Sequence, residues 1–137
     1  MKLHAYTDGA ARGNPGESAS GYRILDSSRR LLCEAAFYNG KCTNNAAEYA
    51  GIIAAMKKAL QLGCDDLVLS SDSRLVINQI AGSYKVKSSN LKAFNREAKA
   101  LLGRFKKHEL LNVPRENKEV KLVDGKLNEF LDEKQGT

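Results

Sequence analysis

The sequence predicts an α/β fold built on a five-stranded mixed sheet, with three antiparallel and two parallel strands flanked by helices. Two observations predict it. Three stretches of strand length follow one another near the N-terminus, and the hydrophobic period then changes to that of a helix. Consecutive strands pair antiparallel, whereas strands separated by helices extend a sheet in parallel.

Three strands are expected in the first part of the chain. Residues 2–8 alternate as a strand that we expect to end at Asp8. Glycines and a proline within residues 9–16 then predict a turn. Residues 20–28 and 29–40 predict the next two strands.

A long amphipathic helix is expected after these strands. Thr43 or Asn44 caps its start, and it ends near Gly63. Its apolar residues recur at helical spacing on one face: Tyr49, Ile52, Ile53, Met56 and Leu60.

The rest of the chain adds two strands and three helices. A short apolar strand over residues 65–72 again ends on an aspartate, Asp72. The other expected elements are helices over residues 73–82, 90–107 and 115–134 and a strand over residues 108–114. Residues 135–137 are expected to fray.

Length and composition limit the class of protein. Residues 1–137 suit a single domain. No apolar run approaches the roughly 20 residues that span a bilayer, so we expect a cytoplasmic or nucleoid-associated protein that does not bind membranes. Three cysteines without metal or disulfide spacing are expected to be idle thiols. The net charge of +6 favours a nucleic-acid partner, although it could equally serve solubility.

Three acidic residues lie at positions from which their carboxylates could converge. Asp8 and Asp72 each end a strand. Glu48 lies on the long helix, about 100° from the middle of its apolar face, at the edge of the expected helix–sheet interface. If the first and fourth strands are neighbours, the three carboxylates converge. Taken singly, each aspartate also suits an ordinary turn or cap.

Converging carboxylates repel one another and have raised pKa values unless a cation neutralises them. Hard oxygen ligands of this kind suit Mg²⁺ or Mn²⁺. Two such ions, about 3.5–4 Å apart, activate a water and stabilise the leaving oxygen in phosphodiester cleavage. Gly9 and the small residues after Asp8 would let a nucleic-acid backbone approach closely.

Four sequence motifs together resemble type 1 ribonuclease H over essentially the whole chain. They are YTDGAARGNPG, TNNAAEYAGIIAAM, SDSRLVINQI and NVPRE. The resemblance implies a ribonuclease H fold. It also implies an endonuclease that cuts the RNA strand of an RNA–DNA hybrid and leaves 5′-phosphate and 3′-hydroxyl ends. Asp8, Glu48 and Asp72 then match the family's metal-binding catalytic acids.

The resemblance also assigns substrate-binding residues. Asn14, Asn44 and Asn45 match positions that contact the RNA strand in the minor groove, where 2′-hydroxyls distinguish RNA from DNA. Lys41 and Thr43 match a pocket for a DNA phosphate, or they simply lead into the helix. The remaining matches are Arg74, where many members have Gln, and Lys85 and Lys87 on a substrate-facing connection. The chain has no Trp and so lacks the Trp-containing basic protrusion of some members, which predicts modest hybrid affinity.

The fourth acid of the family lies early in the last helix, within a sequence motif such as N-x-x-A-D-x-L-A-N. Counting forward from Asn117 places it on Lys121, and counting back from Asn128 places it on Asp124. Asp124 lies about 70° from the centre of the apolar stripe and Lys121 about 130°, which favours Asp124 as the fourth catalytic and metal-binding acid. Otherwise Asn117 or no residue fills this position. Gly125 predicts a local irregularity.

The loop before the last helix carries a His in many members, but Asn112 stands near that position. The metals must then do most of the water activation. This departure, with the altered fourth-acid region, leaves two other hypotheses open. One is a hybrid-binding or duplex-binding module without catalysis, and the other is a housekeeping α/β domain that binds RNA through its basic surface. We expect a monomer with no obligate protein partner.

Overall fold

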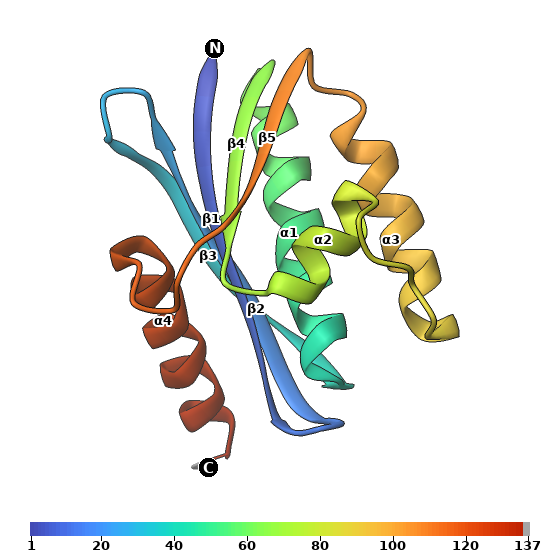
Figure 1. The fold of residues 1–137 in the computed structure, drawn as a ribbon. Helices are drawn as coiled ribbons and strands as arrows, with labels where there is room; N and C mark the ends of the chain where they lie inside the picture. The colour runs from blue at the N-terminus through green and yellow to red at the C-terminus, as the bar shows by residue number, and fades with distance from the viewer. Residues whose placement is uncertain (136–137) are drawn as a thin grey trace.

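A computed structural model of the chain describes residues 1–135 and contains one five-stranded sheet in the order β3-β2-β1-β4-β5 (Figure 1). The strands are β1 (Lys2–Gly13), β2 (Gly16–Asp26), β3 (Leu31–Cys42), β4 (Asp66–Ser71) and β5 (Lys107–Asn112). The first three strands pair antiparallel, and β4 and β5 extend the sheet in parallel from β1. The predicted mixed sheet is therefore confirmed.

The hairpin of β1 and β2 is longer than the sequence predicted. β1 does not end at Asp8 but pairs with β2 as far as Gly13, which lies opposite Gly16. The turn is therefore confined to Asn14 and Pro15. The prediction that the turn begins at Gly9 is therefore wrong, because residues 9–12 each pair with a residue of β2. On its other side β1 pairs with β4 only up to Thr7.

Helices cover both faces of the sheet (Figure 1). The helices α1 (Asn44–Gln61), α2 (Arg74–Ala81) and α3 (Ser89–Leu102) lie on one face, and α4 (Lys118–Gln135) lies on the other. Thr43 caps α1 by accepting a hydrogen bond from the Ala46 backbone N–H, at 3.1 Å. The prediction that the third helix reaches residue 107 is wrong, because α3 ends at Leu102 and Lys107 already belongs to β5.

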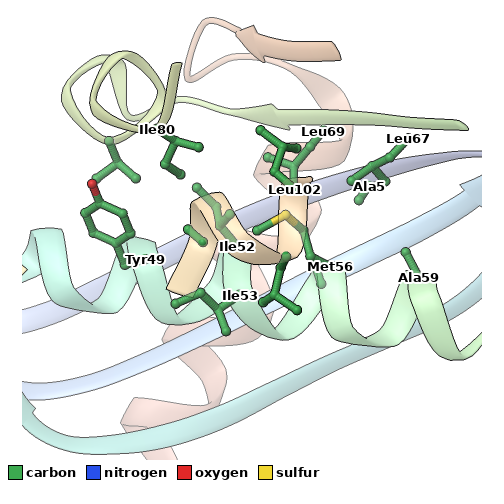
Figure 2. Close-up of a cluster of buried hydrophobic side chains, with 14 of the residues drawn as sticks. Ala5, Tyr49, Ile52, Ile53, Met56, Ala59, Leu67, Leu69, Ile80 and Leu102 are labelled. Carbon is green, nitrogen blue, oxygen red and sulfur yellow. The ribbon is translucent and has the colours of Figure 1, made fainter. Parts of the chain in front are cut away.

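The main core lies between the sheet and α1, α2 and α3. Figure 2 shows Ile52 and Met56 of α1 packed beneath Leu67 and Leu69 of β4, with Tyr49 of α1 at the other end of the cluster, near Ile80. Ile80 of α2 and Leu102 of α3 close the same cluster. The face of α1 that the sequence predicted to be apolar is therefore the one that packs.

A second, smaller core joins α4 to the opposite face of the sheet. Val123, Leu127 and Leu131 are buried there against Ala19 of β2, with Ala10 of β1 packed beside them. The helix is continuous through Gly125, so the predicted irregularity is wrong. Gln135 is its last residue, which contradicts the predicted fraying there, and residues 136 and 137 lie outside the described part of the chain.

Within residues 1–135, none of the helices has the length and apolar character needed to cross a membrane.

Candidate active site

The site lies where β1 and β4 separate. The last paired residues of the two strands are Thr7 and Ser71. Asp8 is the next residue of β1, and Asp72 is the next residue after β4, so both reach the same level of the sheet. Beyond this point β1 pairs only with β2, and within residues 1–135 no strand pairs with its other edge.

Glu48 reaches this gap from the first turns of α1. Close approach of the helix depends on Gly9, because a Cβ atom there would lie 2.3 Å from the carbonyl carbon of Ala47. Gly51 allows the same approach one turn later, since its Cβ would lie 2.9 Å from the backbone oxygen of Asp8. Gly9 therefore serves the close packing of α1 against the strand.

The three carboxylates meet in this gap. One ligand oxygen from each of Asp8, Glu48 and Asp72 lies within 4.8 Å of the others. The backbone N–H of Gly9 donates to Asp8 Oδ1 at 2.9 Å and to Glu48 Oε1 at 3.2 Å. The Ser71 hydroxyl donates to Glu48 Oε2 at 3.4 Å. Asp8 and Glu48 are buried, with 5% and 8% of their surface exposed.

Burial and mutual repulsion raise the pKa values of the carboxyls in this cluster. Burial raises the pKa of Asp8 to about 7, with a further contribution from the charge of Asp72. Burial and the neighbouring Asp8 raise the pKa of Glu48 well above its ordinary value. The pKa of Asp72 is also raised, mainly by burial. A buried group of hard oxygen donors in this state fits a divalent cation such as Mg²⁺ or Mn²⁺.

Asp124 of α4 faces the same cavity. It is half-buried, and its charge contributes to the raised pKa values of Asp8 and Asp72. The two alternatives lie elsewhere. Lys121 is exposed, and the Asn117 side-chain oxygen accepts hydrogen bonds from the first N–H groups of α4, those of Glu119 and Val120. The geometry therefore favours Asp124 for the fourth acid.

These four acids line one cavity of about 610 Å³, here called the carboxylate cavity. Gly9, Asn44 and Asn45, which the resemblance assigns to substrate binding, line it as well. Three other lining residues were missed: Ser73, Arg115 and Asn128. The charge of Arg115 opposes the rise in the pKa of Asp72. The sequence motif NVPRE contains this arginine, but only the tertiary structure places it beside Asp72.

Asn14 and Asn44 tie the hairpin to the start of α1. Asn14 Oδ1 accepts the backbone N–H of Asn44 at 3.1 Å, and Asn44 Oδ1 accepts the backbone N–H of Ala11 at 2.9 Å. Their side-chain NH₂ groups have no hydrogen-bond partner among residues 1–135 and remain available to a ligand. Asn14 itself is exposed and does not line the carboxylate cavity.

Four of the remaining predicted substrate residues line two neighbouring cavities, and Arg74 lines neither. Lys41 and Thr43 border one of about 670 Å³, here called the Lys41 cavity, which Asn90 and Phe94 of α3 also line. Lys85 and Lys87 border another of about 630 Å³, here called the Lys85 cavity, which Asn45 shares with the carboxylate cavity. Arg74 is exposed at the start of α2 and donates to the Tyr84 hydroxyl at 3.1 Å.

No histidine among the described residues lines the carboxylate cavity. Asn112, near the expected position, ends β5, and its side chain donates to the backbone oxygen of Ser71 at 3.1 Å. Its role is thus to hold β5 against the end of β4.

Comparison with known proteins decides the family. The sequence model of the family described as Reverse transcriptase-like matches residues 6–121. The crystal structure of RNase H1 from Halobacterium salinarum NRC-1 superimposes with a TM-score of 0.92 at 36% identity, covering 97% of this chain and 99% of that one. This chain belongs to the type 1 ribonuclease H family. The predicted ribonuclease H fold is therefore confirmed.

Other members of the family show the same likeness. In sequence, the chain is 37% identical to Ribonuclease HI of Halobacterium salinarum over 96% of its length, and 36% identical to the Bifunctional protein Rv2228c of Mycobacterium tuberculosis over 84%. It spans 65% of the first protein and 32% of the second. The structure of LC11-RNase H1 in complex with RNA/DNA hybrid superimposes with a TM-score of 0.81 at 33% identity, covering 94% of this chain and 99% of that one.

Proposed function

We propose that this protein is an endoribonuclease that hydrolyses the RNA strand of RNA–DNA hybrids. The observation that carries the proposal is the convergence of Asp8, Glu48 and Asp72 in one cavity of a ribonuclease H family member. Water attacks a phosphorus of the RNA strand, and the bond from phosphorus to the 3′-oxygen breaks. The products are a 5′-phosphate and a 3′-hydroxyl. The named ribonuclease H relatives and the hybrid-bound relative support this substrate.

Two divalent cations, Mg²⁺ or Mn²⁺, are proposed as cofactors, held by Asp8, Glu48, Asp72 and Asp124. When bound, such ions activate water and stabilise charge on the leaving oxygen. The chain prepares their site in two ways. The Gly9 N–H fixes one oxygen each of Asp8 and Glu48. Burial raises the pKa of Asp8 to about 7, so Asp8 is partly protonated at neutral pH, and burial raises the pKa of Glu48 as well. Cation binding must therefore displace protons, which predicts tighter binding as the pH rises.

Arg115 is proposed to contact the phosphate that is cut. It is exposed on the loop between β5 and α4, and its charge acts on Asp72 across the carboxylate cavity. A guanidinium is always charged and matches the geometry of phosphate oxygens. Because no histidine lines the cavity among the described residues, Arg115 is the cationic side chain nearest the chemistry there.

The start of α1 is proposed to lie in the minor groove of the hybrid. Gly9, Asn44 and Asn45 line the carboxylate cavity, and Asn14 adjoins it through Asn44. Their amide groups can form hydrogen bonds with 2′-hydroxyls, which only the RNA strand carries. The neighbouring cavities are then proposed for the DNA strand: the Lys41 cavity, with Thr43, for a phosphate, and the Lys85 cavity, with Lys87 and Arg74 nearby, for the backbone.

We further propose that the described sheet and helices form one ribonuclease H domain that acts as a cytoplasmic monomer. Light scattering during gel filtration measures the mass directly. A dimer would contradict the monomer without affecting the proposed reaction.

The proposal is tested with an RNA–DNA hybrid labelled on either strand, alongside single-stranded RNA, double-stranded RNA and double-stranded DNA. We expect cutting of the RNA strand of the hybrid alone, with products that carry 5′-phosphates. Tight hybrid binding without cutting in either Mg²⁺ or Mn²⁺ would instead identify a binding module. Equal cutting of all RNA substrates would contradict hybrid specificity.

A further inference from the structure

We infer that Arg12 and Asn128 are positioning residues for Asp124: they fix α4 along β1 and hold the Asp124 carboxylate toward the other acids. The inference rests on the proposed function, because it assigns a task to residues around the proposed fourth acid. It is carried by a chain of hydrogen bonds that runs from Arg12 through Asn128 to Asp124.

The first step is the register between α4 and β1. Alternate residues of a strand face the same side, so Tyr6, Asp8, Ala10 and Arg12 all point toward α4. Tyr6 packs with Val120, and Ala10 packs with the cluster around Leu127. Two strand residues advance about 6.6 Å and four helix residues about 6 Å, so the pairing repeats along both elements. This register puts Asp124 opposite Asp8.

The second step is the contact at the outer end of this register. Arg12 Nη2 donates to the backbone oxygen of Asn128 at 3.2 Å and to its Oδ1 at 3.3 Å. Arg12 Nη1 donates to Gln135 Oε1 at 2.8 Å and lies 2.7 Å from Asp132 Oδ1. One side chain of β1 therefore holds the last two turns of α4. A slide of the helix by one residue would move all these acceptors by about 1.5 Å relative to Arg12.

The third step is the orientation of the Asn128 amide. Arg12 offers only donors, so the amide oxygen faces Arg12 and the NH₂ group faces the opposite way. There Asn128 Nδ2 donates to Asp124 Oδ2 at 3.3 Å and to the Asp124 backbone oxygen at 3.1 Å. An ionised carboxylate only accepts, so the amide matches both neighbours. Asn128 thus holds one oxygen of Asp124 and leaves the other to a ligand.

The need for such a hold follows from where Asp124 lies. Asp8 and Glu48 are buried and share the Gly9 N–H, whereas Asp124 is only half-buried and is followed by Gly125. A half-buried aspartate keeps rotamer freedom that a packed one has lost. Side chains that orient a metal ligand through a hydrogen bond typically contribute 10–100-fold to metal affinity or activity.

The test compares Asn128→Ala and Arg12→Lys with wild-type protein. We measure the Mg²⁺ concentration that gives half-maximal hybrid cleavage and, without substrate, Mn²⁺ binding by calorimetry. Asn128 is exposed on a helix, so Ala there keeps the fold. We expect Asn128→Ala to raise both the required Mg²⁺ concentration and the Mn²⁺ dissociation constant by about tenfold. Arg12→Lys keeps the charge but loses the paired donors, and should shift both in the same direction.

Two controls separate positioning from general stability. Lys126→Ala removes the 2.8 Å ion pair between α4 and Glu34 of β3 without touching the chain from Arg12 to Asp124, and should leave both readouts unchanged. In an Asp124→Asn background, Asn128→Ala should have no further effect. The inference is wrong if Asn128→Ala binds Mn²⁺ as wild type does, or if its effect persists without Asp124. Failure of wild-type protein to cut hybrid would instead contradict the proposed function, and the calorimetry would still test the positioning.

Discussion

Asp8 and Glu48 accept hydrogen bonds from the same donor, the backbone N–H of Gly9, although 40 residues separate their places in the chain and they reach the site from a strand and a helix. A single N–H cannot neutralise two buried carboxylates. The pKa of Asp8 is therefore raised to about 7, and that of Glu48 is raised as well. The pair is prepared for a cation that completes the charge balance.

Replacement of an acid by its amide should separate chemistry from folding. We expect Asp8→Asn to lower hybrid cleavage by about 100-fold or more, because metal ions and the acids that hold them supply most of the activation. Circular dichroism should show an intact fold, since Asn keeps the shape of Asp and still accepts from the Gly9 N–H. Full activity in Asp8→Asn would contradict a catalytic role for this carboxylate.

The stability of the metal-free protein should depend on pH through Asp8. Its pKa is about 7 in the folded state against 3.8 ordinarily, so the folded protein binds a proton more tightly than the unfolded chain. The free energy of unfolding contributed by Asp8 is therefore present below about pH 4 and is lost as the pH rises to about 7.

Urea unfolding of wild type and Asp8→Asn in EDTA, at pH values from 4 to 8, measures this contribution. The variant should become more stable than wild type by about 4 kcal/mol across this window, and the difference should level off above pH 7. A difference that stays constant with pH would show that the carboxyl of Asp8 is not perturbed.

Gly9 and Gly125 should respond oppositely to alanine. Gly9→Ala forces a Cβ to within 2.3 Å of the Ala47 backbone and should destabilise the fold by about 3 kcal/mol while displacing Glu48. Gly125 lies in α4 with open space around its Cβ position, so Gly125→Ala should stabilise by about 0.5–1 kcal/mol. Thermal denaturation compares the two. A harmless Gly9→Ala would refute the close packing of α1 on β1.

The assignment of the fourth acid can be tested on two residues of one helix. Asp124→Ala should lower cleavage at least about tenfold and raise the Mg²⁺ requirement, because the residue lines the carboxylate cavity. Lys121→Ala changes an exposed residue one turn earlier and should have little effect. Wild-type rates in Asp124→Ala would show that three acids suffice.

Arg115→Ala tests the proposed contact with the cut phosphate. We expect a loss of about tenfold or more in cleavage rate, since hydrogen bonds to charged groups contribute about 1.5–3 kcal/mol. Arg115→Lys should recover only part of the rate, because Lys offers a point charge without the planar fork. Complete rescue by Lys would mean that only charge matters, and an unchanged rate in Arg115→Ala would exclude the contact.

The sequence alone predicted the sheet and the helices because each has a distinct hydrophobic period. It could not predict that β1 continues past Asp8, since Gly9 to Gly13 have little strand propensity and only pairing with β2 keeps them extended. Asp8 and Asp72 were predicted to meet if the first and fourth strands are neighbours, and the sheet order β2-β1-β4 meets that condition. Asn128 and Arg115 were missed because their partners lie far away in the chain and no periodicity marks such contacts.

The most direct test of the account compares wild type with Asp72→Asn on one labelled RNA–DNA hybrid, in Mg²⁺ and in EDTA. The account predicts cutting of the RNA strand by wild type in Mg²⁺, none in EDTA, and recovery when Mg²⁺ is restored. Asp72→Asn should bind the hybrid and leave it uncut. Cutting that persists in EDTA, or in Asp72→Asn at the wild-type rate, would contradict a metal-dependent site built on these carboxylates.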